Sequence, residues 1–335
     1  MKPLTVAVVG ATGLVGETLL RLFAERRLPI ADLRLFASQR SSGTRVFALG
    51  REIEIQKLDT SNPKSFAAVD VAFFAADAET SRAFAPKLAA QGILVIDKSA
   101  AFRLDPSVPL VVPEVNRHAL PGHKLIANPN CSTIPLAVML GPIHQRFGLQ
   151  WVSVATYQSV SGAGKDALDE FERQARGDRA PAKALPHRAV ANVFPENGPV
   201  DSSGYGEEER KIAAELKKIL SDENVLVSAT SVRVPVAVCH GEAVAFQTRE
   251  RALHEDIAQI LRSAPGVKFL EGSAYATPLE VAGTDDVVVG RLRSDTAHPS
   301  AYLAWVMSDN LRKGAATNAI QIFEAALAMQ AKAAV

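Results

Sequence analysis

The sequence predicts an α/β fold: a Rossmann-type, doubly wound parallel sheet with an inserted α+β domain. Short apolar runs alternate with amphipathic stretches over the first third of the chain, which is typical of β-α-β units. From Gly148 on, long β-type runs follow one another with few helices between them, which indicates a mixed or antiparallel sheet. An Ala-rich segment at 312–334 has apolar residues at helical spacing, so we expect a terminal helix.

The elements of the first domain are expected to alternate along the chain. Strands are predicted at Thr5–Val9, Leu33–Ala37, Val69–Ala75 and Ile93–Asp97, and helices at Leu14–Glu25 and Glu79–Ala90. We expect this domain to comprise residues 1–134 together with 310–335. The crossover connections that join parallel strands require such helices.

The second domain is expected at residues 135–309. Its predicted strands are Leu149–Ser159, Val225–Arg233, Val236–Thr248, Val287–Leu292 and Ala301–Met307, with a charged amphipathic helix at Glu207–Leu220. Residues 173–206 are rich in Ala, Pro, Gly and Asp and are predicted to form an irregular excursion. We see no internal repeat.

Composition and charge narrow the class of protein. The formal net charge of +1 argues against a broad nucleic-acid surface or an anionic membrane face. The longest apolar candidate, Ile134 to Ile143, is shorter than the roughly 20 residues needed to span a bilayer. Two cysteines, Cys131 and Cys239, do not make a disulfide framework. We therefore expect a cytoplasmic protein without a membrane or nucleic-acid partner, and no metal site.

A glycine-rich segment lies between the first predicted strand and helix. It reads Gly10-Ala11-Thr12-Gly13-Leu14-Val15-Gly16. The first glycine permits a tight turn, the second lets the backbone approach a pyrophosphate, and the third lets the helix pack close to the sheet. The spacing is GxxGxxG rather than GxGxxG, and a plain glycine turn is the alternative; in this context we predict a dinucleotide site.

The end of the second predicted strand indicates which dinucleotide binds. An NAD site places an acid there for the ribose 2′-hydroxyl. This chain instead has Ser38, Arg40 and Ser41 in the sequence SQRSSG, with no acid. A guanidinium and hydroxyls donate hydrogen bonds to a 2′-phosphate. We therefore predict NADP; the alternative is an ordinary polar loop.

Cys131 is the candidate nucleophile. It follows the polar turn Asn128-Pro129-Asn130, and a helix is predicted to begin near Ser132 or Thr133. The positive end of a helix dipole favours a thiolate, the reactive form of cysteine. Most free cysteines are buried apolar residues, and Cys239, inside a predicted apolar strand, fits that description.

A thiolate beside a nicotinamide site indicates one chemistry. The thiolate adds to an aldehyde, hydride leaves to NADP⁺, and an external nucleophile releases the acyl group from the resulting thioester. The residues therefore predict an NADP-dependent aldehyde dehydrogenase that works through a thiolate at Cys131.

Six motifs resemble those of the aspartate-semialdehyde dehydrogenase family and occur in the same order. They are GATGLVG at 10–16, SQRSSG at 38–43, NPNCST at 128–133, YQSVSGAG at 157–164, RVPV at 233–236 with a histidine at 240, and SDNLRKGAA at 308–316. The resemblance covers nearly the whole chain. One departure is Cys239, which stands where the family usually has glycine.

The resemblance implies a role for each matching residue. Cys131 would be the nucleophile, His240 the general acid/base, and Gln158 the residue that orients the substrate. Arg233 would bind the substrate α-carboxylate and Glu208 its α-amino group. The phosphate ligands would be Arg103, Asn130 and Lys211. The remaining cofactor contacts would come from Ser161, Gly162, Ala163, Gly164 and Asn310.

The resemblance also implies the reaction and the assembly. The reaction would be reductive dephosphorylation of L-4-aspartyl phosphate by NADPH, leading toward lysine, methionine and threonine. The active site would lie in a crevice between the domains, and the protein would be a homodimer that pairs through the second domain's sheet.

Several alternatives stay open from the residues alone. A strand histidine such as His240 is more often structural, and Glu208 and Lys211 lie three residues apart on one helix, where they could form a solvated pair. An N-acetyl-γ-glutamyl-phosphate reductase would share the architecture and thiol chemistry, although Glu208 favours a free ammonium. A non-catalytic paralogue is the alternative from another class, but the candidate nucleophile and base are both present.

Overall fold

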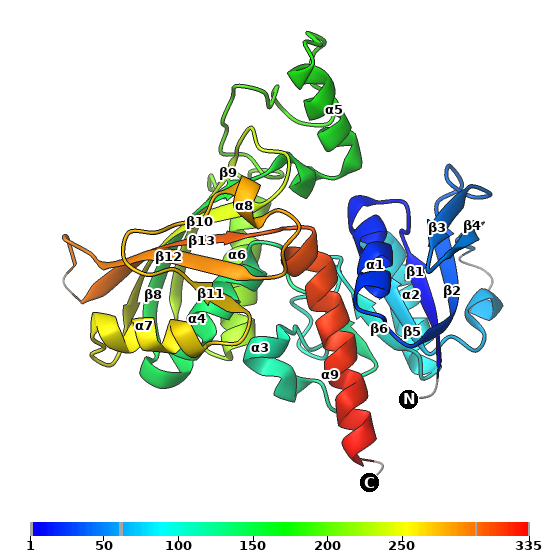
Figure 1. Ribbon diagram of the computed structural model, residues 1–335, viewed down its shortest axis with the longest axis horizontal. Coiled ribbons are helices and arrows are strands. Elements are labelled where there is room, and N and C mark those ends of the chain that lie inside the picture. The colour runs from blue at the N-terminus through cyan, green and yellow to red at the C-terminus, as the bar shows by residue number, and fades with distance from the viewer. Residues whose placement is uncertain (1–2, 60–62, 299, 334–335) are drawn as a thin grey trace. The chain divides into compact units, whose positions relative to one another are not determined.

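The computed structural model describes residues 3–59, 63–298 and 300–333. The chain forms two compact units (Figure 1), which are Met1–Pro129 with Ala315–Val335, and Asn130–Gly314. The first boundary falls before Asn130, so that Cys131 belongs to the second unit together with the long strands. The α/β fold predicted from the sequence is confirmed.

The first unit is built on a seven-stranded sheet in the order β3-β4-β2-β1-β5-β6-β7. Its strands are β1 Leu4–Val9, β2 Ile30–Ala37, β3 Arg45–Ala48, β4 Arg51–Lys57, β5 Val71–Phe74, β6 Leu94–Asp97 and β7 Leu125–Ala127. All neighbours pair in parallel except the β3-β4 hairpin. The chain runs outward from β1 to β2 and β4, then returns to β5 on the other side of β1, so the strand order reverses beside β1, where open α/β sheets bind ligands.

Helices cover both faces of this sheet. They are α1 Leu14–Glu25, α2 Ala78–Ala90, the short α3 Pro113–Asn116 and α9 Thr317–Ala333, with single 3₁₀ turns at Pro63–Phe66 and Arg117–Ala119. On one face Phe23 of α1 and Phe323 of α9 both pack on Phe73 of β5, with ring centroids 5.3 and 5.9 Å apart. On the other face Phe66 stacks on Phe36 of β2 and contacts Phe84 of α2.

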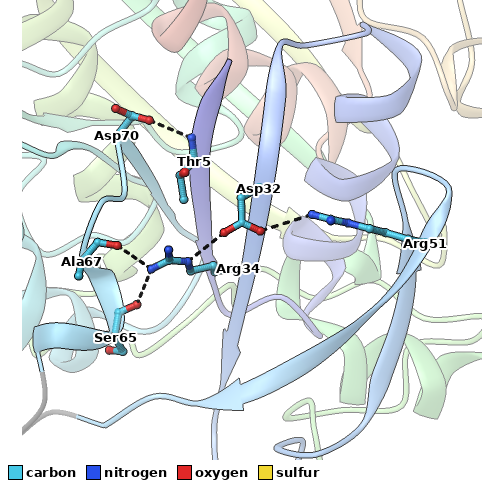
Figure 2. Close-up of polar contacts among 7 residues, drawn as sticks. All are labelled: Thr5, Asp32, Arg34, Arg51, Ser65, Ala67 and Asp70. Carbon is cyan, nitrogen blue, oxygen red and sulfur yellow. Dashed lines mark hydrogen bonds and ion pairs between the residues drawn. The ribbon is translucent and has the colours of Figure 1, made fainter. Parts of the chain in front are cut away.

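Polar contacts tie β2 to the segments beside it (Figure 2). Asp32 on β2 accepts hydrogen bonds from Arg34 at 3.1 Å and from Arg51 on β4 at 3.4 Å. Arg34 also donates to the carbonyls of Ser65 and Ala67 at 3.2 and 2.7 Å. These contacts join β2 to the start of β4 and to the 3₁₀ turn and the residue after it that precede β5.

The second unit is built on a six-stranded sheet in the order β11-β12-β13-β10-β8-β9. Its strands are β8 Leu149–Gln158, β9 Leu226–Arg233, β10 His240–Thr248, β11 Val267–Phe269, β12 Val287–Ser294 and β13 Ala301–Ser308. Its helices are α4 Thr133–Phe147, α5 Lys165–Ala175, α6 Glu207–Leu220, α7 His254–Ser263 and α8 Pro278–Val281. The sheet is mixed, because β10 pairs antiparallel with β8 and β13 whereas β8 and β9 are parallel.

The two faces of this sheet differ. Helices α4, α6 and α7 pack on one face, and residues such as Val152 and Val154 of β8 are buried beneath them. On the opposite face Tyr157 of β8 is 40% exposed and lies against Trp305 of β13, with ring centroids 5.5 Å apart.

Three predictions of local structure need correction. The strand predicted at Val236–Thr248 begins only at His240, because Pro235 cannot donate to a ladder and Cys239 has a φ of +78°. The irregular excursion predicted at 173–206 begins later, since α5 extends to Ala175. The helix predicted from Arg312 starts as a π-helical turn over Arg312–Ala316. No helix among the described residues combines the length and apolarity needed to cross a bilayer.

Candidate active site

Strand register in the second unit brings three of the candidate residues into one row. His240 on β10 lies opposite Gln158 on β8, and Gln158 is paired with Arg233 on β9. All three side chains lie on the helix-covered face and are buried, at 1, 2 and 5% exposure. Residues that are 7 to 82 positions apart in the sequence thus lie side by side, because β8 and β9 end and β10 begins at this row.

Cys131 faces this row from the turn that precedes α4. Its Sγ lies 3.4 Å from Nε2 of His240. Asn130 shapes the turn, since its side-chain oxygen accepts the N–H of Ser132 at 2.8 Å and its carbonyl accepts the N–H of Ile134 at 3.1 Å. The sulfur therefore sits at the N-terminal end of α4, where the helix dipole favours the thiolate.

Two glutamates of α6 hold the nucleophile turn. The carboxylate of Glu208 accepts hydrogen bonds from the side chains of Asn130 at 2.9 Å and Gln158 at 3.1 Å. The fully buried Glu215 accepts the main-chain N–H of Asn130 at 2.6 Å. The sequence analysis missed Glu215, although its position seven residues after Glu208 places both on the same helix face. Gln158 also donates to Ser132 Oγ at 2.8 Å.

Arg233 is a buried cation with an unused donor. One of its Nη atoms donates to the carbonyl of Ser159. Within the described residues its Nε has no hydrogen-bond partner. Burial lowers the pKa of Arg233, and the charges of Cys131 and Glu208 partly oppose that shift. A buried guanidinium with a free N–H is suited to bind a carboxylate.

His240 is enclosed on all sides. Burial, followed by the charge of Arg233, lowers the pKa of His240 to about 3. Its Nδ1 accepts the main-chain N–H of Ser159 at 3.1 Å. Cys239, the preceding residue, is buried as well, and burial raises the pKa of its thiol to about 12, which keeps that thiol protonated.

The segment after β8 approaches this cluster through its backbone. An added Cβ at Gly162 would lie 3.0 Å from Nε2 of His240 and 3.1 Å from Arg233 Nη1, closer than ordinary van der Waals contact. Ser161 is buried and bonded to Asn310, whereas the neighbouring Ala163 is exposed and Gly164 has a φ of +97°. A flat ligand on this side of His240 would therefore contact the main chain of this segment rather than side chains.

The backbone at Gly314, in the SDNLRKGAA motif, lies close to the nucleophile Cys131. A Cβ at this position would lie 3.2 Å from Cys131 Cβ. The π-helical turn that contains Gly314 is therefore in contact with the nucleophile turn.

Two of the expected phosphate ligands have other partners in this structure. Lys211 forms an ion pair with Glu207 at 2.6 Å, not with Glu208. Arg103 belongs to the first unit, where its guanidinium is buried and donates to the carbonyls of Asn128 at 3.0 Å and Lys98 at 2.6 Å.

The glycine-rich turn of the first unit has a distinct geometry at each glycine. Gly10 has a φ of +84°, and a Cβ there would lie 2.5 Å from the carbonyl oxygen of Ala75. A Cβ at Gly16 would lie 2.3 Å from the Gly10 oxygen, so the start of α1 packs directly on the turn. At Gly13 the nearest atom would be 3.6 Å away, which leaves the helix N-terminus open.

The first-turn N–H groups of α1, at Leu14 and Val15, have no acceptor within the helix and can bind an anion. The loop after β2 lies beside this turn. Thr12 Oγ1 donates to Ser41 Oγ at 3.4 Å, and Ser38 and Arg40 are exposed on the same loop. These residues could hold a dinucleotide and its 2′-phosphate. Over the described ranges, no three His, Cys, Asp or Glu side chains gather as metal ligands would.

Comparison with known proteins shows which class of protein this chain belongs to. Residues 5–123 match a family model described as "Semialdehyde dehydrogenase, NAD binding domain", and residues 140–313 match "Semialdehyde dehydrogenase, dimerisation domain". The chain is therefore an oxidoreductase with a nicotinamide-nucleotide-binding domain and a dimerisation domain.

Individual relatives define the family. The chain is 43% identical to the aspartate-semialdehyde dehydrogenase of Aquifex aeolicus, over 95% of this chain and 96% of that one. It is 40% identical to the enzyme of Bacillus subtilis, over 96 and 97% of the two chains. A crystal structure of aspartate semialdehyde dehydrogenase II complexed with ASA from Vibrio cholerae superimposes with a TM-score of 0.92 at 39% identity, covering 98% of this chain and 99% of that one. This chain belongs to the aspartate-semialdehyde dehydrogenase family.

Proposed function

We propose that this protein catalyses the NADP-dependent reductive dephosphorylation of L-4-aspartyl phosphate to L-aspartate 4-semialdehyde, through a thioester on Cys131. The observation that carries the proposal is the 3.4 Å contact between Cys131 Sγ and His240 Nε2, beside a buried cation and a carboxylate. The reaction would serve the biosynthesis of lysine, methionine and threonine.

The substrate assignment rests on charge matching. Aspartate semialdehyde carries one α-carboxylate and one α-ammonium group. Arg233, with its unused Nε donor, would bind the carboxylate as a two-point clamp. Glu208 accepts hydrogen bonds from the side-chain amides of Asn130 and Gln158 and would accept the ammonium as well. An acetylated amine would bring no charge to Glu208, which disfavours N-acetyl-γ-glutamyl phosphate as the substrate.

Gln158 and Asn130 would complete the substrate site. Gln158 lies between His240 and Arg233 in the row, and Ser132 and Glu208 hold its amide, so it can orient the reacting carbonyl. Asn130 and Lys211 would contribute to phosphate binding in this unit. Lys211, which pairs with Glu207 at 2.6 Å in this structure, would turn to the phosphate when the substrate binds.

The cofactor assignment rests on the first unit. The open turn at Gly13 and the N-terminus of α1 would hold the pyrophosphate. Ser38, Arg40 and Ser41 would bind the 2′-phosphate of NADP, because no carboxylate occupies the end of β2. When bound, the nicotinamide accepts or supplies the hydride. The backbone of Ser161–Gly164 and the side chain of Asn310 would line the nicotinamide side of the second unit.

We also propose that the protein forms a homodimer through the open face of the six-stranded sheet. Tyr157 and Trp305 lie on that face, and the segment that carries the exposed Tyr275 and Leu279 is anchored there by the bond from Trp305 Nε1 to the Ala276 carbonyl. Large aromatic and aliphatic side chains on a sheet face are typical of subunit interfaces.

A steady-state assay tests the proposed function. Purified protein is supplied with L-aspartate semialdehyde, inorganic phosphate and NADP⁺, and NADPH formation is followed by absorbance. We expect formation only when all three are present, and a much lower rate with NAD⁺. Equal or faster turnover of the N-acetylated glutamate semialdehyde would contradict the substrate assignment, and turnover without phosphate would contradict the acyl-phosphate product.

A further inference from the structure

The buried polar atoms that lack a hydrogen-bond partner gather around the row formed by His240, Gln158 and Arg233. Among the described residues, such side-chain atoms belong to Thr133, Thr156, Asn197, Arg233, Glu242 and Ser308. Proteins pair nearly all of their buried polar groups with other protein groups or with ordered water, because an unpaired group costs free energy. Several of them in one place therefore indicate a site for a small polar ligand, and water is the smallest.

Strand register places three of these residues in one layer next to the row. Side chains two positions apart on a strand share a face, so Glu242 lies on the face of His240, and Thr156 on the face of Gln158. Glu242 is paired directly with Thr156, and Ser308 of β13 directly with His240. The side chains of Thr156, Glu242 and Ser308 are 0, 1 and 1% exposed. They form a buried polar layer on the helix-covered face of the sheet.

Helix α4 packs on the two strands that carry Glu242 and Ser308, which are β10 and β13. Its first residue, Thr133, is fully buried and has an unpartnered hydroxyl of its own. Thr133 lies two positions after Cys131, just as Thr156 and Glu242 lie two positions from residues of the row. The nucleophile and the strands that face it thus each bring an unpaired oxygen to the same helix-sheet interface.

Glu242 has the largest unused capacity for hydrogen bonds in this layer. Neither of its carboxyl oxygens has a partner in the described part of the chain. The titratable or charged side chains on the neighbouring elements, which form no hydrogen bond with it, are Cys131, Glu208, Glu215, Arg233, His240 and Asp309. An unpaired buried carboxylate is strongly unfavourable, whereas a neutral acid offers one O–H donor and an acceptor. Burial accordingly raises the pKa of Glu242 well above its usual value.

We propose that Glu242 is a positioning residue of the active site, which as a neutral carboxylic acid binds ordered water in the polar layer together with the three unpartnered hydroxyls. The water joins the start of α4 to β8 and β10, and so holds Cys131 against Gln158 and His240. Glu242 acts through these residues and does not contact the substrate. The inference rests on the proposed function, in which His240 is the general acid/base.

Water suits this position because it links the elements without adding charge. A bridging water bonds nearly as well as a direct hydrogen bond, and each of its partners can be donor or acceptor. Two residues along a strand span roughly 7 Å. A carboxylate at that distance from His240 would disfavour the Cys131 thiolate by repulsion, whereas a neutral acid leaves the thiolate unaffected.

A crystal structure of the protein without substrate tests the water site. We expect ordered water within hydrogen-bond distance of the Glu242 carboxyl and of the Thr156 and Ser308 hydroxyls. The infrared spectrum of the wild type should contain the C=O stretching band of a protonated carboxylic acid, and Glu242→Gln should lack that band. A dry layer, a cation bound to Glu242, or no difference in this band would each overturn the proposal.

Three variants separate positioning from packing. Glu242→Gln keeps a donor and an acceptor, Glu242→Met keeps the size alone, and Thr156→Val removes one hydroxyl. A misplacement of about 1 Å costs about 10²-fold in rate. We expect kcat close to wild type for Glu242→Gln, and about tenfold to 10²-fold lower for Glu242→Met with the KM for aspartate semialdehyde little changed.

Thr156→Val should lower kcat in the same direction but by less, and it carries the test if Glu242→Met does not fold. Thr230→Val, the same change at an exposed position of β9, is the control and should keep the wild-type kcat. Equal kcat in folded Glu242→Gln and Glu242→Met, or a wild-type kcat in Thr156→Val, would refute a positioning role.

Alkylation of Cys131 by iodoacetamide tests the neutral acid without the proposed substrate. The rate of alkylation as a function of pH gives the pKa of the thiol, and mass spectrometry identifies the modified peptide. Glu242→Gln should leave this pKa unchanged, because one neutral group replaces another. Removal of a negative charge would instead lower the pKa of the thiol. A lower pKa in Glu242→Gln would therefore contradict the inference, whether or not the protein turns over aspartate semialdehyde.

Discussion

Cys239 adopts a backbone conformation that favours glycine. Its φ is +78°, and its side chain is buried among Ala276, Val288 and Met307. A residue with a Cβ pays roughly 1 kcal/mol or more in the left-handed region. The strain lies next to His240, where the turn must place the Cys239 N–H on Asn310.

Comparison of two variants of this residue measures the strain. Both Cys239→Gly and Cys239→Ala remove the buried thiol, but only glycine relieves the backbone. We expect the glycine variant to have the higher free energy of unfolding, by about 1 kcal/mol, in denaturant titration. At an unstrained position the glycine variant would be less stable than the alanine variant by roughly 0.5–1 kcal/mol. A glycine variant that is less stable than Cys239→Ala would therefore show that the backbone at this position is not strained.

Arg40 is expected to select the cofactor. A charge-assisted hydrogen bond contributes about 1.5–3 kcal/mol, so Arg40→Ala should raise the KM for NADP⁺ by about 10-fold or more and change the KM for NAD⁺ little. Arg45→Ala is a matched control, since Arg45 is an exposed arginine of the same unit that pairs with Glu52 at 3.2 Å. Equal effects of Arg40→Ala on both cofactors would remove the argument for NADP.

Some site residues can be predicted from the sequence and others cannot. Cys131 is recognisable because the helix start and its polar turn are local features. His240, Arg233 and Gln158 come together only through strand register, which depends on pairing between distant segments. Without the family resemblance each would be an ordinary buried residue. Glu215 carries no local signal of function, because its bond to the Asn130 N–H depends on how α6 packs beside α4.

At the scale of elements, the start of α2 depends on a cap. Asp77 accepts the N–H and the hydroxyl of Thr80 at 2.8 and 2.9 Å. The hydrogen bond from the Thr80 N–H is the main cause of the lowered pKa of Asp77. The carboxylate therefore stabilises the folded protein above its unfolded pKa of about 3.9, and this contribution is lost as the pH falls through the lower folded value.

Asp77→Ala should lower the free energy of unfolding by about 1 kcal/mol at neutral pH. Asp77→Asn keeps an acceptor for the Thr80 N–H and should lose less. Thermal unfolding over a pH series checks both statements. A difference between wild type and Asp77→Ala that stays constant down to pH values below the folded pKa would show that the cap is not the cause.

Helices whose apolar residues recur at helical spacing were predicted well. The ranges of α1 and α6 agree with the expectation at both ends, because each shows one apolar stripe and a clear boundary. The β3-β4 hairpin was missed, since its residues, such as Arg45, Glu52 and Glu54, are mostly exposed and polar. The start of β10 was misplaced because the apolar residues before His240 form a bent segment outside the strand ladder, in which Val236, Ala237 and Val238 are half-buried and Cys239 is buried.

At the scale of the whole molecule, the open sheet face should control assembly. Tyr157→Glu places a charge in the proposed interface, and burial of an unpaired charge is strongly unfavourable. We expect the wild type to sediment at twice its chain mass of 35.7 kDa and the variant as a single chain. Leu253→Glu, at an exposed position that begins α7 on the helix-covered side, is the control and should remain dimeric. A dimeric Tyr157→Glu would exclude this face.

Covalent chemistry at Cys131 is the central claim, and a single-turnover measurement tests it most directly. The protein is mixed with L-aspartate semialdehyde and excess NADP⁺ without phosphate, and NADPH is followed in a stopped-flow instrument. We predict a burst of one NADPH per chain, with an acyl group on the peptide that contains Cys131 in the mass spectrum. Cys131→Ser should give no such burst, whereas a full burst from that variant, or none from the wild type, would contradict a thioester at Cys131.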